Sequence, residues 1–86
     1  MRETSEIEIT FEEDSLHTEA RASIVLRGAT FTGWGRARRN PSDSNMPMIG
    51  EELATARALS DLAHKLVEAA AETISEAEGQ PVRLQA

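Results

Sequence analysis

The 86-residue chain contains no cysteine, no tyrosine, two phenylalanines and one tryptophan. Without cysteine, neither a disulfide framework nor a thiolate metal site can stabilise the fold. A chain of this length buries only about 60 to 65% of the surface that its unfolded form exposes. Small domains commonly gain the remaining stability by self-association. We therefore expect a homodimer.

Long apolar runs are also absent. No run approaches the roughly 20 residues that span a bilayer, and the first ten residues, MRETSEIEIT, carry charges where a signal peptide needs an apolar core. We therefore expect a cytoplasmic protein without a membrane partner. The formal net charge of -6 opposes non-specific attraction to nucleic acid or to anionic membranes. Any contact with RNA then has to be local.

The sequence contains no recognisable signature of catalysis or of cofactor binding. Ser60, Asp61 and His64 stand close together, but three residues of one helix cannot surround a substrate as a catalytic triad does. Asp61 with Lys65, and His64 with Glu68, have the spacing of ordinary solvated helix pairs. The glycines of GATFTGWG lie along a predicted strand and do not lead into a helix, as a phosphate-binding loop must. Two distant histidines do not form a metal site. We predict no enzyme activity, no cofactor and no metal, and we identify no small-molecule substrate.

Apolar and polar side chains alternate in three segments before Pro41, which is the pattern of strands with one buried face. Asp14 and Ser15 mark the first turn and Gly28 marks the second. Tight turns place one set of side chains on a common inner face: Ile7, Ile9, Phe11, Ala20, Ala22, Ile24, Leu26, Phe31, Gly33, Gly35 and Ala37. Small residues on that face let a helix approach closely, and Trp34 then points to the outer face.

The segment from about Gly50 to Gly79 has the apolar period of a helix. At about 42 Å this helix is longer than strands of about 30 Å and overhangs the sheet. Glutamates at its carbonyl end oppose the helix dipole, so we expect that end to fray or to break into a short second helix. Its apolar stripe covers roughly half the circumference: Ile49, Leu53, Ala56, Leu59, Leu62, Ala63, Leu66, Val67, Ala70 and Ile74.

These patterns predict an α+β fold in a single domain over residues 1–86. A three-stranded antiparallel β-meander is followed by one long helix, and the wide stripe needs a second partner beyond the sheet. We expect that partner to be another copy of the chain. The candidate dimer contacts are Val25 on the outer face and three helix residues, Leu66, Val67 and Ile74.

The segment TGWGRARR holds the candidate functional residues Trp34, Arg36, Arg38 and Arg39. Trp34, Arg36 and Arg38 share the outer face by strand alternation. An exposed aromatic ring beside guanidinium groups can stack on a base and pair with phosphates. Tryptophan and arginine are equally typical of protein interfaces. The segment is thus a candidate for RNA contact or for a subunit interface.

The stretches GWGRARRNPSD, IGEELATARALSDLAHKL and EGQPV resemble a small actinobacterial family of unknown function that is associated with stress and dormancy. Members of that family are described as homodimers with a fold similar to ribosome hibernation promoting factors and double-stranded-RNA-binding domains. The resemblance implies a non-enzymatic stress or dormancy protein that associates with the ribosome or with structured RNA. The alternative is a homodimeric protein-interaction module without RNA affinity.

Overall fold

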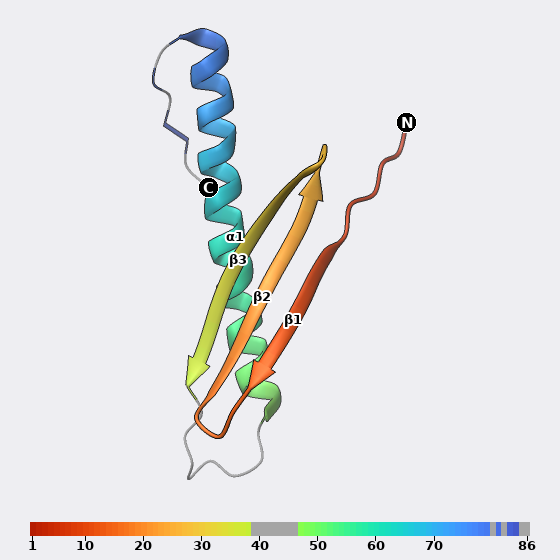
Figure 1. Cartoon of the computed structure of the whole chain (residues 1–86), viewed down its shortest axis with the longest axis vertical. Coiled ribbons are helices and arrows are strands. Elements are labelled where there is room, and N and C mark those ends of the chain that lie inside the picture. The colour runs from red at the N-terminus through yellow and green to blue at the C-terminus, as the bar shows by residue number, and fades with distance from the viewer. Residues whose placement is uncertain (39–46, 80, 82, 85–86) are drawn as a thin grey trace.

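The computed structural model describes residues 1–38, 47–79, 81, 83 and 84. Three strands, β1 (Ile7–Glu13), β2 (His17–Leu26) and β3 (Ala29–Arg38), precede one helix, α1 (Pro47–Glu78), as Figure 1 shows. The predicted β-β-β-α order and the α+β class are confirmed. The sheet is antiparallel with the strand order β1-β2-β3.

The predicted break near the end of the helix is wrong, because α1 runs without interruption to Glu78. No glycine or proline interrupts its second half, and its alanines are strong helix formers. Unfavourable glutamates near the carbonyl end cost only a few tenths to about 1 kcal/mol each. The helix ends at Gly79, which adopts a positive φ of 68° and donates its N–H to the Ser75 carbonyl.

Both predicted turns are present. The Asp14 carboxylate accepts hydrogen bonds of 2.7 Å from the N–H groups of Leu16 and His17. These two bonds lower the pKa of Asp14 below its ordinary value. At the second turn, Arg27 and Gly28 have φ values of 48° and 81°. Two consecutive positive φ angles are typical of a type I′ hairpin turn, and this turn fixes the register between β2 and β3.

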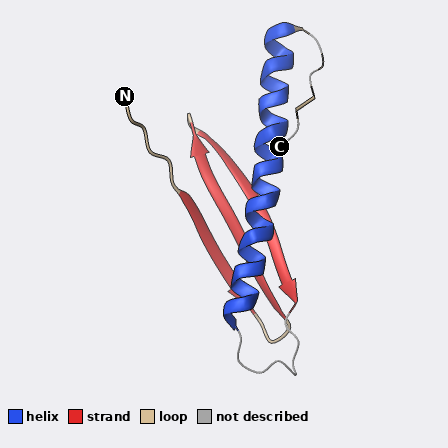
Figure 2. Ribbon diagram, turned by 180° about the vertical axis from the view of Figure 1, so that it is seen from behind, coloured by secondary structure: helices blue, strands red, loops and turns tan. Residues whose placement is uncertain are grey.

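The helix packs chiefly over β3 and β2 and crosses the sheet obliquely, as Figures 1 and 2 show. The register opposes Gly33 to Ala22 and Gly35 to Ala20. A Cβ atom at Gly33 would meet the backbone of Ala58, and a Cβ atom at Gly35 would meet the backbone of Ala54. The prediction that these glycines lie on the inner face and admit the helix is confirmed.

The small core corrects the predicted apolar stripe of the helix. The sheet-facing helix residues Ala54 and Ala58 are absent from that stripe, whereas Ile49, Leu53 and Leu59 in it are exposed. Where the helix rests on glycine and alanine, its small side chains Ala54 and Ala58 face the sheet, while the exposed Ile49, Leu53 and Leu59 form a separate flank of the helix. The buried apolar residues are Ala20, Ala22, Ala37, Ala54, Ala58 and Leu62.

Candidate functional site

Trp34, Arg36 and Arg38 lie on the outer face of β3, which is the side away from α1. All three are exposed, and Trp34 retains 50% of its accessible surface. Sequence reasoning placed them correctly because strand alternation fixes the face. Arg39 lies outside the described residues, and the structure does not place it.

Arg21 is a further member of the candidate site, and sequence reasoning missed it. It lies directly opposite Trp34 across the β2–β3 pair, and its guanidinium carbon is 5.7 Å from the centre of the indole ring. That geometry is a cation–π contact. Counting residues back from the Gly28 turn would have found this pair, because tight turns fix the register of a hairpin.

The outer face carries opposite charges at its two sides. The basic side is built by β3, with Arg21 from β2 leaning toward Trp34. The acidic side is built by β1, where Glu8 and Glu12 share the outer face. Glu19 stands between them, opposite both Glu12 and Arg36. A ligand on this face would therefore meet both signs of charge.

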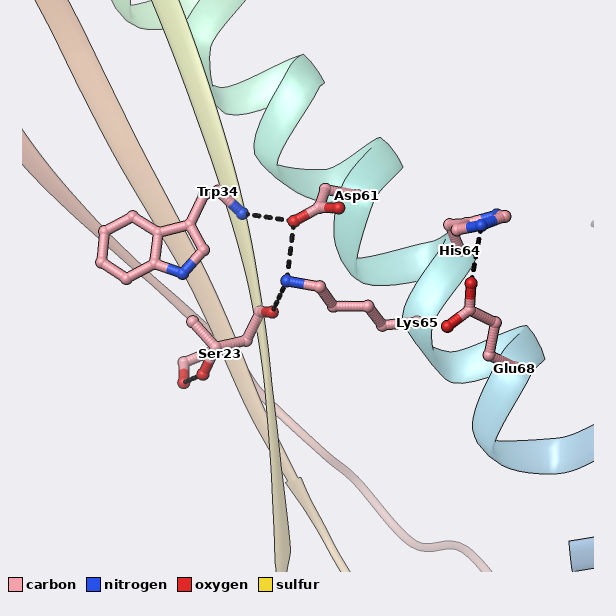
Figure 3. A network of polar contacts seen from close by, with 7 residues as sticks. Ser23, Trp34, Asp61, His64, Lys65 and Glu68 are labelled. Carbon is pink, nitrogen blue, oxygen red and sulfur yellow. Dashed lines mark hydrogen bonds and ion pairs between the residues drawn. The ribbon is translucent and has the colours of Figure 1, made fainter. Parts of the chain in front are cut away.

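Side chains of α1 bond to the open edge of β3, which fixes the strand at the tryptophan (Figure 3). The carboxylate of Asp61 accepts a 2.8 Å hydrogen bond from the backbone N–H of Trp34. Lys65 donates to the Thr32 carbonyl at 2.9 Å, and Arg57 donates to the Arg36 carbonyl at 2.7 Å. The indole ring in Figure 3 lies on the far side of β3 from Asp61. The network thus holds the strand while its outer face stays free.

Asp61 is the central group of this network. Its Oδ2 atom also lies 3.0 Å from the Lys65 ammonium. The Trp34 N–H, followed by Lys65, lowers the pKa of the Asp61 carboxyl below its ordinary value. The sequence predicted the Asp61–Lys65 pair from its helical spacing, and the structure confirms it. The bond to Trp34 comes from tertiary packing, which residue spacing does not reveal.

Three further observations concern the described residues. His64 pairs with Glu68 at 2.9 Å on the exposed side of α1, as its spacing predicted. Within residues 1–38, 47–79, 81, 83 and 84, no three histidine, aspartate or glutamate side chains gather as metal ligands. In the same part of the chain, no helix is long and apolar enough to cross a membrane. The arrangement is suited to binding through a charged, partly aromatic surface.

The predicted dimer contacts come from both sides of the sheet. Val25 is exposed on the outer face of the sheet. Leu66 packs against the core on the inner face, and Val67 and Ile74 are partly exposed on α1. Val25 and Leu66 nevertheless line one hollow between the sheet and α1, and their role as dimer contacts stays a prediction.

Comparison with known proteins places this fold among mycobacterial proteins. The family model described as Rv2632c-like matches residues 3–83. The uncharacterized protein Rv2632c of Mycobacterium tuberculosis is 40% identical over 79 residues, which cover 92% of this chain and 85% of that protein. The uncharacterized protein Mb1767 of Mycobacterium bovis is 40% identical over 78 residues, covering 91% of this chain and 83% of its own. The crystal structure of Rv2632c superimposes with a TM-score of 0.85 at 38% identity, covering 94% of this chain and 96% of that chain.

Proposed function

Because the chain belongs to the Rv2632c-like family, whose matched relatives are uncharacterized, we propose a function from the geometry: a non-enzymatic binding protein that acts as a homodimer. The observation that carries the proposal is the exposed apolar flank of α1. This flank consists of Ile49, Leu53, Ala56 and Leu59, all of which are exposed. A row of this kind on a small protein is typical of an interface.

The dimensions of the chain support self-association. The molecule measures 54 × 30 × 17 Å, and its radius of gyration is 16.4 Å. A compact domain of this length has a radius of gyration of about 12 Å. Leu62 is the one large apolar side chain among the fully buried residues of the described chain. A thin slab with so small a core gains stability when a second copy covers its apolar flank.

A second copy suits this flank because a two-fold axis opposes a surface to itself. An apolar row is complementary to its own copy, whereas a row of one charge is not. The flank also lies at the helix half that is next to the sheet, so two helices can pack without moving the strands. The interface we propose therefore centres on Leu53 and Leu59, and not on the sequence-predicted Leu66, which serves the core of one chain.

Light scattering after size exclusion tests the dimer. At tens of micromolar, we expect the unaltered chain to elute with twice its chain mass and the double variant Leu53→Glu, Leu59→Glu to elute as a monomer. The matched control is Thr30→Glu with Ser15→Glu, which adds the same charge at exposed positions away from the flank. A monomeric unaltered chain contradicts the proposal.

A second candidate function, RNA contact, is favoured by one observation: Arg21, Trp34, Arg36 and Arg38 present an exposed ring and three guanidinium groups on one face. In this form the protein is a stress or dormancy factor that binds the ribosome or structured RNA, a setting that rests on the sequence resemblance. Sedimentation with purified ribosomes across a salt series tests it. A salt-sensitive association supports it, and no association at low salt favours the interaction module.

A further inference from the structure

The two edge strands of the sheet, β1 and β3, differ in whether side chains bond to their outward backbone groups. At the β3 edge, Arg57, Asp61 and Lys65 of α1 occupy three backbone groups. At the β1 edge, no strand follows in the sheet order, and no side chain of the described residues bonds to the β1 backbone. An edge of unpaired backbone groups is a template for another strand.

The register identifies the backbone groups that face the β1 edge. Trp34 N–H points away from β2, because it bonds to Asp61. In an antiparallel ladder the bonding direction alternates along each strand, and Arg21 stands opposite both Trp34 and Thr10. It follows that Thr10 bonds to β2, while the N–H and C=O groups of Ile7, Ile9 and Phe11 face outward.

The inner side of this edge is apolar and incompletely covered. Ile7 and Phe11 remain 45% and 40% exposed, although they share the face of the core. Sheet edges that are protected from pairing carry prolines, bulges or inward-pointing charges. The β1 strand has no proline and no bulge, and its pairing with β2 is continuous from Ile7 to Glu13. Its one charge on the inner face is Glu13 at the end of the strand, opposite the buried Thr18. An added strand would cover these apolar side chains with its own.

The outer side of the same edge is acidic. Glu8 and Glu12 alternate with the inner apolar residues, and Glu6 precedes the strand. The ion pairs found among the described residues are His17–Asp14, His64–Glu68 and Lys65–Asp61, so these three glutamates have no cationic partner there. Like charges opposite one another destabilise a strand pair. A second copy of β1 would bring the same glutamates, whereas a basic strand would neutralise them.

We propose that the β1 edge accepts an extended, basic segment of a partner protein as a fourth strand. The segment alternates apolar residues, which lie beside Ile7 and Phe11, with lysine or arginine, which lie beside Glu8 and Glu12. Main-chain hydrogen bonds hold it, and the alternation selects it, as in other strand-addition complexes. The edge lies in the plane of the sheet, apart from the α1 flank, so this inference does not depend on the proposed dimer.

Amide NMR with a short synthetic peptide that alternates valine with arginine tests the proposal on the full chain. We expect the amide signals of Ile7, Ile9 and Phe11 to shift and their hydrogen exchange to slow. Those of Glu8 and Thr10, already bonded to β2, should change less. The same peptide with methylated valine nitrogens cannot donate to β1 and should not bind. Equal binding of both peptides overturns strand addition.

Two variants separate the backbone contact from the charge. Phe11→Pro removes an outward N–H that β2 does not use and should abolish binding, while the matched control Phe11→Val retains it. Glu8→Lys with Glu12→Lys should weaken binding of the arginine peptide about threefold to tenfold and favour its glutamate counterpart. No binding of the arginine peptide at millimolar concentration overturns the proposal. The proposal is also overturned if, without any peptide, the hydrogen exchange of the Ile7, Ile9 and Phe11 amides slows as the protein concentration rises. A second copy of the chain would then pair with the β1 edge.

Discussion

The backbone N–H of Trp34 donates a 2.8 Å hydrogen bond to the carboxylate of Asp61, and this bond links the outer edge of the sheet to the helix. An edge strand normally leaves such groups to water or to another chain. Here the helix supplies the acceptor, and Lys65 adds a donor to the neighbouring Thr32 carbonyl. The bond therefore closes one edge of the sheet and fixes the backbone from which the indole projects outward.

We predict that this bond makes stability depend on pH. The pKa of Asp61 is lowered from its ordinary value of 3.8, chiefly by the Trp34 N–H and then by Lys65. A carboxyl with a depressed pKa in the folded state contributes stability above its unfolded pKa. That contribution is lost as the pH falls through the folded pKa. Urea unfolding should show the loss below about pH 4.

The matched variant is Asp61→Asn, which keeps an oxygen acceptor for Trp34 but removes the charge. It should be less stable than the unaltered chain at neutral pH, and the difference should shrink as the pH falls below about 4. Asp14 also has a lowered pKa and contributes to the same decline in both proteins. A difference that stays constant down to low pH contradicts the role of the Asp61 charge.

We predict that Gly35→Ala destabilises the fold although alanine is the better strand residue. Its Cβ would meet the backbone of Ala54 and Ala58, which no side-chain rotation can relieve. Overpacking of this kind costs about 1 to 3 kcal/mol. Urea or thermal unfolding measures the change, and Thr30→Val on the exposed outer face of the same strand is the control. A raised melting temperature would mean that the helix does not rest on Gly35.

The inner position of Gly35 could be predicted from the sequence because the Gly28 turn sets the register and alternation sets the face. The face of α1 that packs against Gly35 could not be predicted in this way. A hydrophobic stripe selects the largest apolar residues, so it favoured Leu53 and overlooked Ala54. Contact with a glycine row instead requires the smallest helix side chains, and only the packed structure shows where that row lies.

The candidate site also has features that the sequence predicts and features that only the structure shows. The outward position of Trp34 follows from alternation, and Arg21 could have been found by the same counting. The bond between Asp61 and Trp34 joins residues of different elements, and nothing in their local sequence indicates it. The structure likewise separates Val25 from Val67, because a pattern along the chain does not say which faces share one side of the molecule.

We predict that Thr18→Val stabilises the protein. Thr18 is fully buried on β2, and its hydroxyl has no hydrogen-bond partner in the part of the chain that the structure describes. Burying such a group without a partner costs about 1 to 3 kcal/mol, and valine has nearly the same shape. Chemical unfolding should show a gain of about 1 kcal/mol, whereas Thr18→Ala, which leaves a void, should not. If Thr18→Val instead lowers the stability, the Thr18 hydroxyl has a hydrogen-bond partner in the folded protein.

The double variant Arg36→Ala, Arg38→Ala distinguishes the two proposed functions. Both side chains are exposed on the outer face, and their removal leaves the core and the α1 flank intact. If they contact RNA, ribosome association should weaken and its log–log salt slope should fall by about one unit for each lost phosphate contact. The dimer mass should not change.

If the outer face is a subunit interface, the same variant should change the dimer mass, and Trp34 fluorescence in the unaltered chain should be blue-shifted and shielded from quenchers. If it is free, half-exposed Trp34 should be readily quenched by iodide, an anion that the nearby Arg21 attracts. We expect ready quenching and an unchanged mass, because the proposed dimer forms through the α1 flank. The acidic Glu12 and Glu19 adjoin the arginines and oppose binding of RNA to this face. If the double variant and the unaltered chain sediment with ribosomes in the same way, the arginines do not contact RNA, and the protein-interaction module is favoured.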